Sequence, residues 1–206
     1  MTRPSVSLRP AQSTLEEGRA CVRYLDEAAE GFFRILLGRR AVEILAQAYV
    51  QPGNEYSYEH AIFAERDGRI VGLALGFTAE QRRGFPANPL ARSHGYPRVR
   101  AGIVRFLMGP MIRVLDTVPD GDFYLLSLAI DGDHRGQGIG SALMEAMAQR
   151  ALGIGAKRFA LDVAVKNEGA RRLYERHGLA VESKWPKRLN LGSLGLLRMA
   201  KPLRSI

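Results

Sequence analysis

The chain of 206 residues holds one cysteine, Cys21, and no apolar run that approaches a membrane span. A single cysteine excludes an intramolecular disulfide and a cysteine-based zinc site, and it suits a reducing compartment. Crossing a bilayer as a helix takes about 20 consecutive apolar residues. We therefore expect a soluble, cytoplasmic protein with no membrane partner, in which Cys21 is a buried thiol on an amphipathic helix.

Acidic residues are also missing between Glu80 and Asp116, although the chain as a whole has a formal net charge of +9. A positive balance of this size attracts polyanionic ligands. Aromatic residues are sparse in the stretch, so the platform on which nucleic-acid bases stack is not indicated. We expect a solvated basic face, or contact with an acidic substrate or partner, and nucleic acid is disfavoured. The arginines of the stretch are Arg82, Arg83, Arg92, Arg98, Arg100, Arg105 and Arg113.

Hydrophobic periodicity predicts an α/β protein in one domain that spans residues 1–206. Asp67-Gly68 is a strong hairpin signal between two strands. The segment 79–120 is rich in proline, glycine and arginine, and we interpret it as a basic insertion that holds one helix near 98–115. Outside the insertion, strands are expected near 5–9, 58–66, 69–78, 123–130, 157–163, 179–185 and 194–201, and helices near 13–30, 38–50, 138–152 and 168–177.

The most informative stretch is His134-Arg-Gly-Gln-Gly-Ile-Gly-Ser-Ala-Leu143, where a predicted strand gives way to a predicted helix. Its three glycines lack a Cβ, so the backbone can take positive φ and a ligand can approach the main chain closely. The first N–H groups of a helix have no intrahelical partner and carry a partial positive charge. We predict that this turn binds a pyrophosphate, with a charge-assisted contact from Arg135.

Two common phosphate-binding motifs fit the stretch less well. A P-loop requires a lysine after the glycines, and none follows them here. The dinucleotide-binding fingerprint is nearly met by Gly136, Gly138 and Ser141, with Asp162 at the distance of a ribose-binding acid. That fold needs two βαβαβ halves, however, and only one βαβ unit is visible, so a dinucleotide-binding module stays open as an alternative.

The stretch Arg135-Gly-Gln-Gly138-Ile-Gly140 resembles the Gln/Arg-x-x-Gly-x-Gly/Ala acyl-CoA motif of the GNAT family of N-acetyltransferases. Other segments resemble further parts of that family in the same order: its first strand (Val6–Ala11), a strand hairpin (Ala61–Gly72), the helix after the fifth strand (Asn167–Gly178) and the closing strand (Arg198–Leu203). The resemblance implies a mixed, mostly antiparallel central sheet flanked by helices. It also implies that the parallel strands at 123–130 and 157–163 splay apart.

The resemblance further implies acetyl-CoA as cosubstrate and assigns residues to it. The main chain of Leu128, Ala129 and Ile130 would face the pantetheine arm, and an amide there would stabilise the oxyanion. Asn167 would bond the arm, and Tyr174 would donate a proton to the departing sulfur. Core packing is the alternative role for Tyr174. The diphosphate would lie on Arg135, Gly136, Gln137, Gly138, Ile139, Gly140 and Ser141.

The base that accepts the amine proton is the least determined part of the site. Asp162 ends a predicted strand where relatives that acetylate ribosomal proteins carry an acidic residue, and Glu59, Glu55 and water are alternatives. The four histidines lack metal-ligand spacing, so no metal is expected. They are His60, His94, His134 and His177.

These features predict an N-acetyltransferase that transfers an acetyl group to a primary amine by direct attack in a ternary complex. The expected acceptor is an amine-bearing small molecule or a peptide, and a homodimer is left open. A non-catalytic acyl-CoA-binding regulator is the alternative from another functional class. The insertion is expected to border the acceptor site, so the resemblance does not identify the acceptor.

Overall fold

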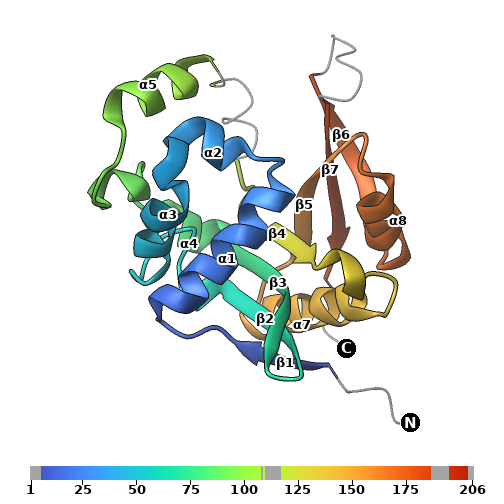
Figure 1. The fold of residues 1–206 in the computed structure, drawn as a ribbon. Coiled ribbons are helices and arrows are strands. Elements are labelled where there is room, and N and C mark those ends of the chain that lie inside the picture. The colour runs from blue at the N-terminus through green and yellow to red at the C-terminus, as the bar shows by residue number, and fades with distance from the viewer. Residues whose placement is uncertain (1–5, 108, 110–116, 187–194, 204–206) are drawn as a thin grey trace.

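The computed structural model describes residues 6–107, 109, 117–186 and 195–203. A seven-stranded sheet forms its centre, with the strand order β1-β2-β3-β4-β5-β7-β6 (Figure 1). The neighbours β4 and β5 run parallel, and all the other neighbouring pairs are antiparallel. The predicted sheet, mixed but mostly antiparallel, is therefore confirmed.

Most of the predicted elements are present, with ends shifted by a few residues. The strands are β1 (Ser7–Pro10), β2 (Ala61–Arg66), β3 (Arg69–Thr78), β4 (Asp122–Ile130), β5 (Arg158–Ala164), β6 (Ala180–Trp185) and β7 (Leu196–Pro202). The α-helices are α1 (Leu15–Ala28), α2 (Phe32–Leu37), α3 (Ala41–Tyr49), α4 (Ala79–Gly84), α5 (Arg98–Leu107), α7 (Ile139–Gly153) and α8 (Glu168–Arg176). Parts of the predictions near 5–9, 98–115 and 194–201 fall on residue 5, residues 108 and 110–115, and residue 194, which lie outside the described residues.

Three local predictions were wrong or incomplete. The helices α2 and α4 were not predicted, because six residues are too few to repeat an apolar face at helical spacing. A capping box between Thr78 and Gln81 starts α4 and was the signal for it. Residues 58–60 form a 3₁₀ turn rather than the start of a strand, because the Ser57 hydroxyl accepts a hydrogen bond from the Glu59 N–H and caps the turn.

Helices cover both faces of the sheet (Figure 1). On one face α1 packs against the sheet, α2 and α3 pack against α1, and α5 packs against α2; they share a core that includes Tyr24, Leu45, Phe63, Leu73 and Tyr124. The opposite face packs against α7 and α8 through a core that includes Phe123, Leu143, Met147, Phe159 and Tyr174. Burial of each large apolar side chain contributes roughly 1.5–3 kcal/mol, so these two layers hold the sheet in place. Cys21 is fully buried in the first core, as predicted, and burial raises the pKa of its thiol.

The parallel pair β4 and β5 is joined over only part of its length. Pairing runs from Asp122 opposite Arg158 to Leu125 opposite Leu161 and then stops. β4 continues beside β3, and β5 continues beside β7. At the same level Leu126 is an extra residue opposite Leu75 and Gly76, a β-bulge of the kind that bends and twists a strand. The predicted splay is confirmed, and Figure 1 shows β5 turning away from β4 beyond this point.

The basic insertion lies between β3 and β4, which are neighbours in the sheet. Its described part contains α4, a 3₁₀ turn (Pro89–Arg92) and α5, and α5 contacts α2. Two of its arginines form ion pairs, Arg82 with Glu55 and Arg83 with Asp120. Among the described helices, none is long and apolar enough to cross a membrane.

His60 is buried between the rings of Phe77 and Phe85, and neither of its ring nitrogens has a hydrogen-bond partner among the described residues. Burial, reinforced by the Arg150 cation and opposed by Glu59, lowers the pKa of His60 from 6.5 to about 4. Below pH 6.5 the unfolded chain therefore binds a proton at His60 that the folded chain does not bind. The free energy of unfolding is unaffected by His60 above pH 6.5, and it decreases as the pH falls toward about 4.

We predict that replacing His60 with leucine removes this pH dependence. The difference in unfolding free energy between wild type and His60→Leu should change by about 3 kcal/mol from neutral pH to the acid end of the transition. Urea unfolding at a series of pH values measures it. His94→Leu, at an exposed histidine, is the control and should leave the pH dependence of the wild type intact. If the unfolding free energies of wild type and His60→Leu change in parallel with pH, His60 is not the source of the pH dependence.

Candidate active site

The turn between β4 and α7 presents main-chain N–H groups at the start of a helix of 15 residues. Gly136 and Gly138 have φ of 72° and 85°, the left-handed region that favours glycine. Among the described residues, no backbone carbonyl accepts a hydrogen bond from the N–H groups of Gly136–Ser141. The first turn of α7 carries no acidic side chain, so its partial positive charge is not neutralised there. This end of the helix has the properties of an anion-binding site.

The third glycine of the turn has a different structural reason. Gly140 is buried, and a Cβ at this position would lie 3.1 Å from Ile130 Cδ1 and 3.1 Å from Leu173 Cδ2. Its missing side chain lets the start of α7 lie close to the end of β4 and to α8. Gly140 thus positions the helix, whereas Gly136 and Gly138 shape the exposed turn.

Arg135 and Gln137 flank this turn and are engaged with other side chains. Arg135 donates from Nη2 to Glu27 Oε1 at 2.6 Å and from Nε to the Ile130 carbonyl at 3.1 Å. Gln137 accepts from Arg66 at 2.6 Å and donates to the Asp133 carbonyl at 3.0 Å. The pair of Arg135 with Glu27 is exposed, and such pairs contribute at most about 1 kcal/mol. A phosphate group can therefore replace Glu27 as the partner of Arg135 at small cost.

Leu128, Ala129 and Ile130 lie on the part of β4 that no longer pairs with β5. Backbone groups of a strand point alternately to its two sides, so the groups that point away from β3 face the gap between β4 and β5. The Ile130 carbonyl accepts the hydrogen bond from Arg135. At this edge the facing main-chain groups of two neighbouring strands, β4 and β5, do not pair with each other.

Asn167 and Tyr174 lie at the start and on the buried face of α8. The Asn167 side chain is exposed and caps the helix, its Oδ1 accepting from the Ala170 N–H at 3.1 Å. Tyr174 is 6% exposed, and its hydroxyl has no hydrogen-bond partner among the described residues. Burial raises the pKa of Tyr174 to about 12. The phenol therefore keeps its proton at neutral pH and remains a hydrogen-bond donor.

Asp162 is the first residue of β5 beyond its shared ladder with β4. Arg198 of β7 donates to both carboxylate oxygens, from Nε at 2.8 Å and from Nη2 at 2.8 Å. The Tyr124 hydroxyl of β4 donates to Oδ2 at 3.0 Å. These three bonds tie the carboxylate to β4 and β7. Its role as a base stays a prediction, and its contacts favour a part in holding the strands.

The alternative bases lie elsewhere in the fold. Glu59 accepts from the Gly53 N–H at 2.8 Å, and Glu55 forms an ion pair with Arg82. Both precede β2, which β3 and β4 separate from β5 in the sheet. The residues that the structure describes include no group of three or more His, Cys, Asp or Glu side chains that could hold a metal ion.

Tyr124 and Arg198 were not predicted as site residues. They lie 38 and 36 residues from Asp162 in the sequence, so no local spacing connects them to it. One signal was available, because Arg198 interrupts the apolar strand Leu196–Ala200 and a charge in a buried strand requires a buried partner.

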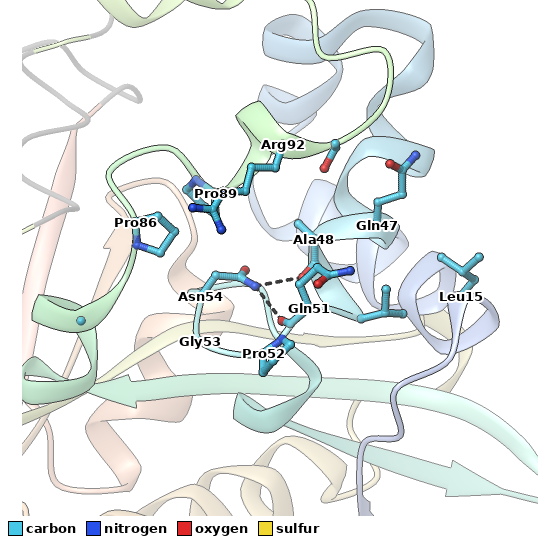
Figure 2. A pocket seen from close by; sticks show the side chains of 13 residues that line it. Leu15, Gln47, Ala48, Gln51, Pro52, Gly53, Asn54, Pro86, Pro89 and Arg92 are labelled. Carbon is cyan, nitrogen blue, oxygen red and sulfur yellow. Dashed lines mark hydrogen bonds between the residues drawn. The ribbon is translucent and has the colours of Figure 1, made fainter.

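A separate groove of about 890 Å³ lies between the end of α3, the loop 51–54 and the insertion (Figure 2). The Asn54 side chain shapes its floor by donating to the Ala48 and Gln51 carbonyls. None of the residues assigned to the acyl-CoA site lines this groove. Its described lining consists of Leu15, Gln47, Ala48, Val50, Gln51, Pro52, Gly53, Asn54, Gly84, Pro86, Pro89, Arg92 and Ser93.

Comparison with known proteins agrees with this arrangement. Residues 22–179 match the Acetyltransferase (GNAT) family, so the chain belongs to the GNAT family of acetyltransferases. Membership implies acyl transfer, which in this family generally uses acetyl-CoA. No curated protein matches the chain by sequence.

Solved structures share the fold over nearly the whole chain. A crystallised acetyltransferase has a TM-score of 0.66 and 24% identity, and the match covers 96% of this chain and 100% of the other. An N-acetyltransferase from Staphylococcus aureus Mu50 has a TM-score of 0.69 and 14% identity, with 95% and 100% covered. The ribosomal-protein-S18-alanine N-acetyltransferase from Escherichia coli has a TM-score of 0.55 and 15% identity, with 98% and 96% covered. At these identities the likeness establishes the fold.

We predict that Gly138→Ala lowers both the affinity for coenzyme A and the free energy of unfolding. A side chain in the left-handed region costs roughly 1–2 kcal/mol, and it would turn the N–H groups of the turn away from their present directions. Affinity measured by calorimetry should fall by roughly tenfold or more, about 1.4 kcal/mol.

Gly155→Ala is the matched control, because Gly155 has φ of 77°, open space around it and a place at the other end of α7. It should show a similar loss of stability with unchanged affinity. If Gly138→Ala and Gly155→Ala bind coenzyme A with equal affinity, the diphosphate does not bind at this turn.

Proposed function

We propose that the protein transfers an acetyl group from acetyl-CoA to a primary amine, by direct attack in a ternary complex. The observation that carries the proposal is the gap between β4 and β5, with the turn of Gly136–Ser141 following the end of β4 and a protonated phenol on the adjoining helix α8. The diphosphate, the extended arm and the thioester of acetyl-CoA would match the turn, the gap and the phenol, respectively.

The residues present fit acetyl-CoA. The N–H groups of Gly136–Ser141, together with Arg135, would hold the diphosphate, because they form a positive cluster with no carboxylate in the first turn of α7. The main chain of Leu128–Ile130 would hold the pantetheine arm as an added strand does. Asn167 would bond the same arm from the start of α8.

When bound, acetyl-CoA supplies a thioester whose carbonyl carbon bonds to the amine nitrogen while the carbon–sulfur bond breaks, and one proton passes in net from nitrogen to sulfur. A β4 amide facing the gap stabilises the developing oxyanion, and the loss of such a donor costs roughly 100- to 1000-fold in rate. Tyr174 donates a proton to the departing sulfur, and burial of the phenol, which raises its pKa to about 12, keeps that proton in place at neutral pH.

The acceptor of the amine proton is the remaining part of the reaction. Asp162 is the acidic residue of β4 and β5 that lies beyond their shared ladder, and it was the candidate from the sequence. Both of its oxygens are held by Arg198 and Tyr124. Water is the alternative acceptor, and loss of the proton to water leaves these contacts unchanged.

A non-catalytic acyl-CoA-binding regulator is the second candidate, and it is favoured by the same engagement of Asp162. It shares every binding feature of the enzyme and differs in turnover alone.

We predict that acetyl-CoA raises the melting temperature of the protein and that NADH does not. A panel of primary amines, including a polyamine, an aminoglycoside, amino acids and peptides, should contain at least one acceptor that releases free thiol from acetyl-CoA. Binding without thiol release across the panel would favour the regulator. A melting temperature that saturating acetyl-CoA leaves unchanged would sink both candidates.

Tyr174→Phe should lower kcat by roughly 100-fold, the usual contribution of a positioned acid, and leave the affinity for CoA nearly unchanged. The hydroxyl has no partner among the described residues, so its removal should also leave the melting temperature unchanged. Steady-state kinetics, calorimetry and thermal melts separate these effects. If affinity and stability collapse together with the rate, Tyr174 serves packing instead.

A further inference from the structure

The short ladder between β4 and β5 has a polar side-chain contact at each end. At its start, Asp122 pairs with Arg158 through an ion pair of 3.0 Å. At its end, Tyr124, which lies opposite Ala160, donates to Asp162 two residues further along β5. The second contact lies where pairing stops and the gap opens. Each contact joins β4 to β5 through a carboxylate, and the two differ in their distance from the gap.

The contact at the gap is part of a buried network that joins three strands. Asp162 lies opposite Arg198 in the β5–β7 register, and the guanidinium grips both carboxylate oxygens. The side chains of Asp162 and Arg198 are 3% and 12% exposed. Arg198 also lies over the Tyr124 ring, 5.4 Å from its centroid, and donates from Nη1 to the Thr117 carbonyl at 3.0 Å.

This geometry constrains the strands more tightly than apolar packing would. A bidentate pair of arginine and carboxylate fixes both distance and orientation, and the Tyr124 bond ties the same carboxylate to β4. Burial makes each bond costly to break, because it would leave an uncompensated charge or polar group. Asp162, the first residue of β5 beyond the ladder, is therefore held at a fixed distance from β4.

We propose that Tyr124, Asp162 and Arg198 are positioning residues that set the separation of β4 and β5 where the gap begins. Through it they set the place of the acetyl thioester relative to the β4 amides and Tyr174. The inference rests on the proposed function. Misplacement of reacting groups by about 1 Å costs on the order of 100-fold in rate, so the network acts on turnover. It acts little on cofactor affinity, because the diphosphate turn lies at the other end of the unpaired part of β4.

The test compares Tyr124→Phe, Asp162→Asn and Arg198→Lys with wild type. Tyr124→Phe keeps the ring and removes one hydrogen bond, and it should lower kcat by about 10- to 100-fold with KM for acetyl-CoA nearly unchanged. Because the three residues act as a unit, the double variant Tyr124→Phe/Asp162→Asn should be little slower than either single variant. A kcat of Tyr124→Phe equal to that of wild type would overturn the inference.

Asp122→Asn is the matched control. It disturbs an ion pair between a buried carboxylate and a partly exposed arginine on the same two strands, at the end of the ladder away from the gap. It should lower the melting temperature yet keep the kcat of wild type. An equal loss of kcat in Asp122→Asn would mean that any weakening of the strand pair slows the enzyme, and the specific role would fail.

The pH dependence of the rate separates positioning from base catalysis. If the network positions the strands, the pH–rate profile of Asp162→Asn runs parallel to that of wild type at a lower level. If Asp162 is the base, Asp162→Asn changes the shape of the profile, and Tyr124→Phe leaves kcat near that of wild type. The second pattern would overturn the inference and restore the base.

Hydrogen exchange distinguishes failure of this inference from failure of the proposed function. Should wild type release no thiol with any amine, the function fails, and the network is judged on exchange alone. Tyr124→Phe should then speed exchange in β4 and β5 around the gap and leave β1 and β2 unchanged, whereas Asp122→Asn should not speed exchange at the gap. Equal exchange in wild type and Tyr124→Phe would overturn the inference.

Discussion

The early end of pairing between β4 and β5 is the constraint on which the rest of this structure depends. Backbone N–H and C=O groups in a sheet interior are normally satisfied by the neighbouring strand. Here the bulge at Leu126 and the return of β5 toward β7 leave two strands with facing edges that do not meet. Such an edge is costly in an empty fold and useful in one that binds an extended ligand, because the ligand completes the missing bonds.

The residues around this gap belong to cores on opposite faces of the sheet. Tyr174 belongs to the core shared with α7 and α8, whereas Tyr124 belongs to the core shared with α1, α2, α3 and α5. The phenol assigned to the departing sulfur and the network around Asp162 therefore approach from opposite sides. An acyl group lying in the gap would have Tyr174 on one side and the network around Asp162 on the other.

The end of α1 is tied to both loops that border the gap. Glu27 pairs with Arg135 in the turn after β4, and Glu30 pairs with Lys166 in the turn after β5, at 2.6 Å each. Both pairs are exposed and contribute little to stability. They keep the cations of Arg135 and Lys166 beside the gap. The family fold does not specify the acceptor.

The sequence by itself determined the order of elements, the glycine turn and the helix of Asn167 and Tyr174, because periodicity, positive φ and helix capping are local properties of consecutive residues. It did not reveal the short helices α2 and α4, since two turns show no repeat. Only the tertiary structure decided the partners of Asp162 and Arg135, which lie 36, 38 and 108 residues away in the chain. A local pattern can place a carboxylate at the end of a strand, but whether its charge is free or held depends on which distant strands the fold brings beside it.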